Sequence, residues 1–212
     1  SGCVALGMLF ILFSLKKIKR LAIIVLSTLL IVGVVISVDY FITDVLKPHQ
    51  QNRIKALINP AADPLGYGWN VTQSKVAIGS GGLLGKGFLE GTQTNLGFVP
   101  EQSTDFIFCT LGEEHGWLGS LLVIYLFIVL FVRLIFLAER QKGRFGRIFG
   151  FSVVAILFIH FMVNVGMTIG FFPVIGIPLP FFSYGGSSLW AFTTLLFIFL
   201  KIDAHRMQVL DR

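Results

Sequence analysis

The 212-residue sequence is poor in charged residues and in cysteine. Charged residues make up 13% of the chain, against about 25% in a soluble globular domain, whereas hydrophobic residues make up 55%. Cys3 and Cys109 both lie in apolar runs, so neither a disulfide framework nor a cysteine-based metal site is supported. This composition excludes an ordinary soluble domain and predicts a membrane protein.

Acidic residues are scarcer than basic ones, with 11 Asp and Glu against 17 Lys and Arg. In a membrane protein such an excess reports first on topology, through the positive-inside rule. We therefore expect membrane lipids and no nucleic acid among the partners. The chain begins at Ser1 without a methionine and inside an apolar run. We expect it to be the later part of a longer polypeptide.

Five apolar runs predict an all-α polytopic membrane protein. A spanning helix needs about 20 residues, so the first, shorter run fits a helix that other residues continue. We expect about five transmembrane helices and a large extracytoplasmic loop that contains re-entrant or interfacial segments. The expected helices cover residues 2–15, 21–38, 106–137, 148–172 and 187–201.

Basic residues cluster at 16–20 and again at 139–147. Such clusters beside membrane helices mark the cytoplasmic side, and the two crossings between them give the same answer by parity. The loop at 39–104 and the Pro-rich loop at 173–186 are then extracytoplasmic, and the C-terminus is cytoplasmic.

The long loop at 39–104 carries frequent turn signals, and long loops of this kind are commonly functional. Within it, residues 76–88 are apolar and rich in glycine but too few to span, which predicts a re-entrant or interfacial segment buried against protein. Lys86 is followed by Gly87 rather than Ser or Thr, which excludes a Walker loop. The backbone amides here could still bind an anion, with charge from Lys75 and Lys86.

Residues 100–116 place four carboxylates at the start of a long apolar run, where an idle charge would be costly. Asp105 follows Ser103 and Thr104 directly before a helix, and helix capping is the structural interpretation favoured by residue type. The negative charge of Glu101 could interact favourably with the dipole of the helix, because it lies just before the helix N-terminus. Glu113 and Glu114 lie deeper, where pairing with Lys or Arg is favoured over a water-filled cavity or a bound cation.

His160, Asn164 and Thr168 lie at i, i+4 and i+8 and so share one helix face. Hydrogen bonding between helices is favoured over a proton relay. After this helix, Pro178, Pro180 and the pair Gly185–Gly186 predict a nonhelical connection at membrane depth. Such a connection must be buried in protein or line a cavity.

Several motifs occur together along residues 53–201. They are Asp63-Pro64-Leu65-Gly66, residues 73–82 (QSKVAIGSGG), Gly91-Thr92-Gln93, residues 100–108 (PEQSTDFIF), residues 112–116 (GEEHG) and residues 178–187 (PLPFFSYGGS). In this combination the chain resembles the SEDS family of bacterial membrane proteins, its RodA branch more than its FtsW or SpoVE branches. The match corresponds to the C-terminal half of the family pattern. In one departure, Ser103 stands where RodA relatives often carry a histidine.

The resemblance implies a peptidoglycan glycosyltransferase of the bacterial inner membrane. Such enzymes polymerise lipid II, an undecaprenyl-linked disaccharide peptide, for cell-wall elongation and rod shape, and work with a class B penicillin-binding protein. Alternatives are a flippase of the lipid-linked precursor and a noncatalytic scaffold for the penicillin-binding protein.

The resemblance also implies roles for individual residues. Asp105 matches the catalytic aspartate and would be the general base. A divalent cation such as Mg²⁺ is the candidate cofactor, at an unknown metal site. Substrate binding is expected from Arg53, Lys55, Lys75, Lys86, Glu101 and Ser183. A structural or cavity-lining role is expected for Glu113, Glu114, His160, Asn164, Pro178, Pro180, Gly185 and Gly186.

Overall fold

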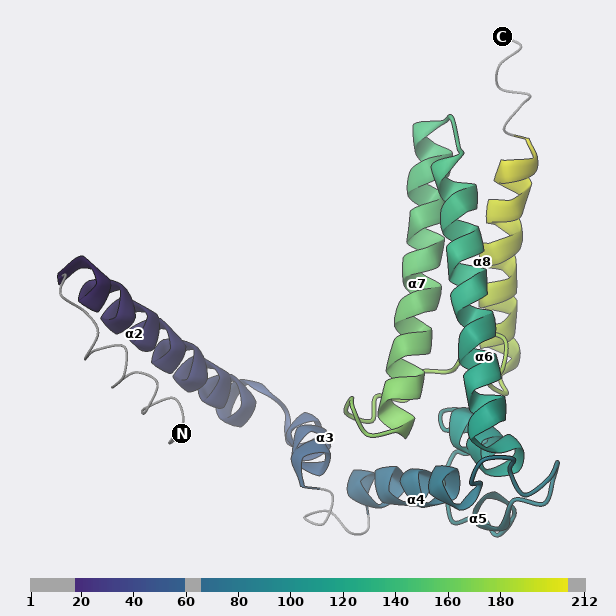
Figure 1. Cartoon of the computed structure of the whole chain (residues 1–212), viewed down its shortest axis with the longest axis horizontal. Coiled ribbons are helices and arrows are strands. Elements are labelled where there is room, and N and C mark those ends of the chain that lie inside the picture. Colours follow the sequence, from purple (N-terminus) through teal and green to yellow (C-terminus); the bar gives the residue numbers. More distant parts are fainter. Residues whose placement is uncertain (1–17, 60–65, 206–212) are drawn as a thin grey trace. The chain divides into compact units, whose positions relative to one another are not determined.

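The computed structural model describes residues 18–59 and 66–205 (Figure 1). This part of the chain contains helices and no strand, which confirms the predicted all-α class. The predicted helix at 2–15 lies outside the described residues. The helices are α2 (Ile18–Tyr40), the π-helix η1 (Phe41–Val45), α3 (Pro48–Ile58), α4 (Tyr67–Ser80), α5 (Thr92–Asn95), α6 (Ile107–Glu139), α7 (Arg144–Thr168) and α8 (Gly186–Ala204).

The chain divides into two compact units between Gln51 and Asn52. In the first unit, α2 contains the predicted helix at 21–38, and its apolar part includes Ile24–Val38. The hydroxyl groups of this helix donate to its own backbone: Thr28 Oγ1 to the carbonyl of Ile24 at 2.7 Å, and Ser37 Oγ to that of Gly33 at 2.7 Å. Polar side chains are thereby tolerated in an apolar helix.

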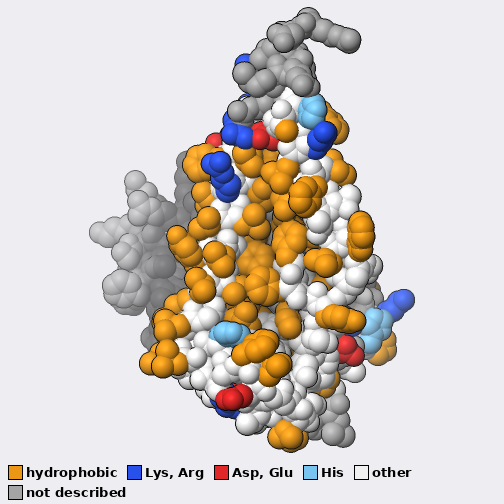
Figure 2. All heavy atoms as spheres, turned by 90° about the vertical axis from the view of Figure 1, so that its right-hand side faces the viewer, with side chains coloured by type: hydrophobic (Ala, Val, Ile, Leu, Met, Phe, Trp, Pro, Cys, Tyr) orange, Lys and Arg blue, Asp and Glu red, His pale blue; other side chains and the backbone are white. Residues whose placement is uncertain are grey.

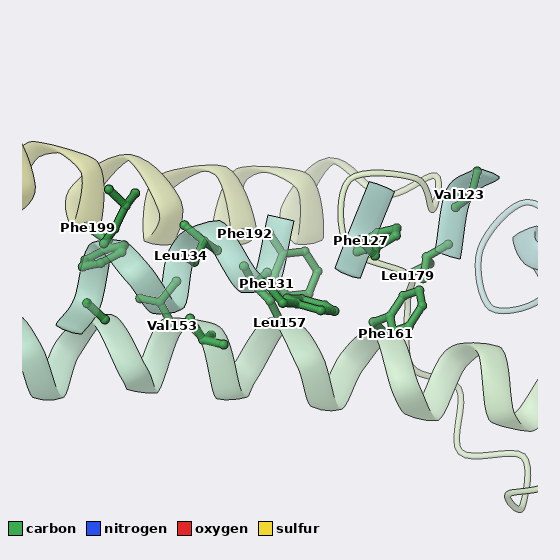
Figure 3. Packing of buried hydrophobic residues seen from close by; sticks show 13 residues of the cluster. Val123, Phe127, Phe131, Leu134, Val153, Leu157, Phe161, Leu179, Phe192 and Phe199 are labelled. Carbon is green, nitrogen blue, oxygen red and sulfur yellow. The ribbon is translucent and has the colours of Figure 1, made fainter. Parts of the chain in front are cut away.

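In the second unit, α6, α7 and α8 are long and apolar enough to cross a membrane. They run alongside one another (Figure 1) and pack through aromatic and aliphatic side chains (Figure 3). Phe127 of α6 and Phe161 of α7 lie 4.6 Å apart between ring centroids. Gly150 of α7 admits Phe199 of α8, whose ring would lie 2.5 Å from an added Cβ. Small residues at such contacts let membrane helices approach closely.

The ends of α7 differ from the predicted span of 148–172. The helix begins at Arg144, after the extended residue Gly143, so the basic connection to α6 is short. It ends in a Schellman motif, in which Phe171 N donates to Gly166 O at 2.7 Å and Gly170 has a φ of +78°. Residues 169–172 therefore do not extend the helix as predicted.

The predicted loop at 39–104 is largely helical, since it contains η1, α3, α4 and α5. The helix α4 packs against α6 and α7 across one end of the bundle (Figure 1). Ser74 Oγ donates to the carbonyl of Thr168 at 2.8 Å, and Val71 and Ala77 are buried beside Phe106. Of the segment at 76–88 that was predicted to be buried against protein, only Ala77 and Gly81 are buried. Val76, Leu83, Leu84 and Phe88 are exposed, so the prediction is wrong for most of the segment.

The helix α6 is interrupted at Gly116, whose φ of 65° and ψ of −161° are not helical. The prediction of a continuous helix at 106–137 is wrong at this residue. The glycine-rich loop at 81–87 supplies the hydrogen bonds that the break removes. Lys86 N and Gly87 N donate to the carbonyls of Glu113 and Glu114, at 3.1 and 3.0 Å. On the far side of the break, Trp117 N and Leu118 N donate to Gly82 O and Leu83 O, at 2.9 and 3.1 Å.

Backbone contact at the break requires glycine. An added Cβ at Gly116 would lie 2.3 Å from Gly85 N, and one at Gly85 would lie 2.1 Å from Glu114 O. A Cβ at Gly81 would lie 2.1 Å from Gly112 O. The loop and the broken helix can therefore exchange hydrogen bonds only while these positions lack side chains.

Charged side chains gather toward the ends of the helical unit, with hydrophobic side chains between them, on the face shown in Figure 2. At the end that carries the α6–α7 connection, Arg140 and Asp203 form an ion pair between α6 and α8. Gln141 Nε2 donates to Asp203 Oδ1 at 2.6 Å. These contacts fasten the end of α8 to the end of α6.

Candidate active site

Asp105 lies directly before α6, at the opposite end of the bundle from the α6–α7 connection (Figure 1). The helix N-cap is Phe106, and no side chain caps the helix by a hydrogen bond. The capping interpretation of Asp105 is therefore wrong. Partial burial raises the pKa of the Asp105 carboxyl, and the neighbouring charge of Glu101 raises it further. This environment suits a general base.

The backbone around Asp105 accepts hydrogen bonds from α7 and from the Pro-rich loop. Asn164 Nδ2, from α7, donates to Asp105 O at 2.8 Å and to Ile177 O at 2.7 Å. Ser183 Oγ donates to Thr104 O at 2.6 Å, and Tyr184 N donates to Ser103 O at 2.9 Å. Residues 103–105 thus join the start of α6 to α7 and to the Pro-rich loop.

Glu101 has a φ of 53°, which is uncommon for a residue with a side chain. Its carbonyl accepts hydrogen bonds from Thr104 N, Asp105 N and Phe106 N, at 3.3, 3.1 and 3.2 Å. Its carboxylate is exposed and accepts a hydrogen bond from Thr104 Oγ1 at 3.2 Å. Glu101 therefore shapes the turn before α6 and adds negative charge beside Asp105.

Gly176 of the Pro-rich loop lies against the Asp105 carboxylate. Its φ is +80°, and an added Cβ would lie 3.0 Å from Asp105 Oδ2. Gly176 is not among the site residues predicted from the sequence. Its signal was present, since Gly176 lies in the nonhelical segment between Pro173 and Pro178, but only the fold shows what it faces.

Arg53 and Lys75 are the predicted basic residues with contacts near these loops. Arg53 Nη1 donates to Ile175 O at 3.4 Å, one residue from Gly176. Lys75 is exposed, and its Nζ would lie 2.5 Å from a Cβ added at Gly170, at the end of α7. Lys55 is exposed on α3. Their binding of substrate stays a prediction.

Lys86 is engaged elsewhere. Its ammonium donates to Glu113 Oε1 at 2.7 Å, to Ser80 Oγ at 2.8 Å and to Thr92 Oγ1 at 2.6 Å. An ammonium has three donors, so these contacts use all of them. Lys86 thus pairs with a carboxylate, and its binding of substrate stays a prediction.

Glu113 is one of the two deep carboxylates that were predicted to pair with Lys or Arg, and Lys86 is its partner. Glu113 is fully buried, and it also accepts hydrogen bonds from Gln93 N at 2.8 Å and Thr94 N at 2.9 Å. Pairing with a basic residue is therefore confirmed for Glu113. Glu114 is also buried, beside the break in α6.

Ser183 is buried, and its hydroxyl both donates to Thr104 O and accepts from Leu179 N at 2.7 Å. Ser183 thus holds the backbone of two segments, and its contact with substrate stays a prediction. The connection predicted at 173–186 is nonhelical as far as residue 185, with Val174, Leu179 and Pro180 buried and Pro178 half-buried. Gly185 is the N-cap of α8 and Gly186 its first residue.

The three polar residues predicted to share one face of α7 make different kinds of contact. Asn164 makes the predicted hydrogen bonds to other segments, whereas Thr168 Oγ1 donates to its own helix at Val165 O, 2.7 Å away. His160 packs edge-on against Phe192 of α8, with centroids 4.9 Å apart. A role for His160 in proton transfer stays a prediction.

The described residues contain no group of three or more His, Cys, Asp or Glu side chains placed to hold a metal. Mg²⁺ is commonly bound by one or two carboxylates together with substrate phosphates. Asp105 and Glu101 supply two neighbouring carboxylates of this kind, so the divalent cation stays a prediction.

An apolar cavity of about 650 Å³ lies between α4, α6 and α7. Phe108 and Val165 line it, the first three residues after Asp105 and the second next to Asn164. Trp117 and Leu83, at the break in α6, line it as well and are exposed. Apolar space therefore adjoins the candidate site.

The chain is similar in sequence to a known protein family. The sequence matches the FtsW/RodA/SpoVE family, described as "Cell cycle protein", over residues 1–208. The chain belongs to the FtsW/RodA/SpoVE family. This confirms the resemblance given by the motifs. The three helices long and apolar enough to cross a membrane agree with a membrane-embedded member of this family.

Two relatives carry names from peptidoglycan synthesis. The chain is 42% identical over 206 residues to the peptidoglycan glycosyltransferase MrdB of Escherichia coli K12, covering 97% of this chain and 54% of that protein. It is 42% identical over 163 residues to the peptidoglycan glycosyltransferase RodA of Treponema pallidum, covering 77% of this chain and 38% of that protein. The chain thus spans about half the length, or less, of these relatives.

A solved structure has the same fold. It comes from work on the coordination of polymerization and crosslinking by a peptidoglycan synthase complex, and it matches with a TM-score of 0.66 and 30% identity. The match covers 86% of this chain and 49% of that one. The all-α membrane fold of this family member is therefore seen in a solved relative.

Proposed function

We propose that this chain carries the catalytic carboxylate of a peptidoglycan glycosyltransferase that polymerises lipid II, with Asp105 as the general base. The observation that carries the proposal is the Asp105 carboxylate, half-buried before a spanning helix, with its pKa raised and no capping role. Relatives named peptidoglycan glycosyltransferase support it.

The proposed reaction is a single displacement with inversion. Asp105 accepts the proton of the acceptor sugar's 4-hydroxyl as that oxygen bonds to the anomeric carbon of the donor sugar. The bond from that carbon to the pyrophosphate oxygen breaks, and undecaprenyl pyrophosphate leaves with the electron pair. A raised pKa makes Asp105 a stronger base than an ordinary aspartate. Arg53, beside the same loop, is the best-placed basic residue to offset the leaving negative charge.

The charge distribution supports an orientation for this chemistry. The α6–α7 connection carries Arg140 and Lys142, and the first turn of α7 adds Arg144 and Arg147. The positive-inside rule puts such a basic connection in the cytoplasm. Asp105, at the other end of α6, then faces the outside of the inner membrane. The C-terminal end of α8, fastened to Arg140 through Asp203, is then cytoplasmic.

A class B penicillin-binding protein is the proposed partner, and cell-wall elongation the proposed process. The solved relative belongs to a complex that coordinates polymerization and crosslinking, which supports a partner that crosslinks. A scaffolding role for the outer segment, which is the loop predicted at 39–104, is compatible with this activity.

A flippase of the lipid-linked precursor is the alternative, because transporters often bind substrates at discontinuous helices. Here the loop at 81–87 lies at the break at Gly116, and its backbone groups form hydrogen bonds with the backbone groups of the broken helix. These hydrogen bonds favour the glycosyltransferase.

The test is lipid II polymerisation by protein expressed from its complete reading frame with its penicillin-binding partner. Asp105→Ala and Asp105→Asn are expected to abolish glycan-strand formation while the protein still reaches the membrane. Glu90→Gln, which changes an exposed carboxylate of the outer segment, is the matched control and should retain activity. Polymerisation by both Asp105 variants would remove Asp105 from the catalytic role.

A further inference from the structure

We propose that Asn164 is a positioning residue for the Asp105 carboxylate, an inference that rests on the proposed function. Its amide nitrogen donates to Asp105 O at 2.8 Å and to Ile177 O at 2.7 Å. One side chain of α7 thereby holds both the segment that carries the carboxylate and the segment that contains Ile177.

The two segments are those that fix where the carboxylate lies. Asp105 O belongs to the residue that carries the carboxylate, and Ile177 follows Gly176, whose backbone lies against Asp105 Oδ2. Without the Asn164 amide, both the backbone of Asp105 and the loop beside its carboxylate lose their tie to α7. A displacement of about 1 Å at a reacting group can cost about 100-fold in rate.

The burial of Asn164 points to this role. The side chain is fully buried, yet its Oδ1 has no hydrogen-bond partner among the described residues. A buried amide with an unsatisfied oxygen needs an explanation, because an apolar side chain would avoid that penalty. The explanation offered by the contacts is that the two Nδ2 donors hold the site.

Thr168 provides the contrast, one helical turn further along the same face. It is also fully buried, but its hydroxyl donates to Val165 O of its own helix. Its link to another segment is made by its backbone carbonyl, which accepts from Ser74 Oγ. A Thr168→Val substitution therefore removes a buried polar group of α7 without touching Asp105.

The experiment compares Asn164→Leu with Thr168→Val in the full protein and its partner, measuring kcat and KM for lipid II. Leucine matches asparagine in shape and removes both donors. The expected result for Asn164→Leu is a kcat lower by about 100-fold with KM within about threefold of the wild type. Thr168→Val is expected to keep both constants within about threefold.

A second variant covers the case in which Asn164→Leu does not fold. Asn164→Ser is smaller and keeps one donor, so its kcat should lie between those of the wild type and the leucine variant. A wild-type kcat in a folded Asn164→Leu or Asn164→Ser protein, or an equal loss in Thr168→Val, would overturn the inference. Activity in the Asp105 variants would instead overturn the proposed function, so the two failures are distinguishable.

Discussion

The ammonium of Lys86 and the carboxylate of Glu113 lie 2.7 Å apart where the glycine-rich loop enters the break in α6. The Glu113 side chain is fully buried, and that of Lys86 is 25% exposed. Since Gln93 N and Thr94 N also donate to this carboxylate, one glutamate joins α6, the loop and α5. A carboxylate within an apolar helix suggests a catalytic role by its residue type, but Glu113 instead holds these three segments together.

Lys86→Met should destabilise the protein by about 3 kcal/mol. The substitution leaves the Glu113 charge buried without its cation, and breaking a buried pair in this way costs about 3–5 kcal/mol. The lower end applies because Lys86 is partly exposed. Thermal unfolding in detergent measures the effect, with Lys142→Met, an exposed lysine of the α6–α7 connection, as the control. Combining Lys86→Met with Glu113→Gln should recover part of the loss; a double variant as unstable as the sum of the singles would contradict the pairing.

Gly116→Ala should also destabilise the protein by about 3 kcal/mol. Its φ of 65° disfavours any side chain by about 1–2 kcal/mol. The new Cβ would lie 2.3 Å from Gly85 N, and such overpacking costs about 1–3 kcal/mol more. Gly186→Ala is the matched control, since nothing lies within 4 Å of its added Cβ. Equal melting temperatures for the two variants would mean that the break in α6 does not need glycine.

Glu101→Gln should move the acid limb of the polymerisation rate to lower pH. Burial is the main reason that the pKa of Asp105 is raised, and the charge of Glu101 is the second. A general base works when deprotonated, so lowering its pKa extends activity toward acid. Glutamine still accepts from Thr104 Oγ1, which preserves the local turn. The pH profile of kcat/KM is the measurement, and Glu90→Gln should leave that profile in place.

The helices that could be predicted from sequence are the spanning ones, because their signal is a run of apolar residues. The helix α3 was missed because it is polar (PHQQNRIKALI), and the search for apolar runs could not find it. The break at Gly116 could not be predicted either. A glycine inside a helix costs only about 1 kcal/mol, and what opens α6 here is the loop at 81–87, some thirty residues earlier.

The candidate site was predictable in part for a related reason. Asp105 was selected by its motif, and Asn164 by its helical spacing, but the bond between them joins residues 59 positions apart. Ser183 was assigned to substrate, although its hydroxyl holds the Thr104 backbone. Residue type shows which groups can do chemistry, whereas the fold decides which of them are already occupied by hydrogen bonds.

Asp105→Asn should be at least as stable as the wild type at neutral pH, although inactive. The pKa of Asp105 is raised in the folded protein above its ordinary value of 3.8. Between these two pKa values the folded state binds more protons than the unfolded state, so stability falls as pH rises through that window and stays lower above it. Asparagine has the same shape without the charge, and so it avoids the cost of burial beside Glu101. Melting temperatures of both proteins between pH 4 and pH 8 test this. A variant that melts several degrees below the wild type at pH 7 would show instead that the carboxylate makes a stabilising contact.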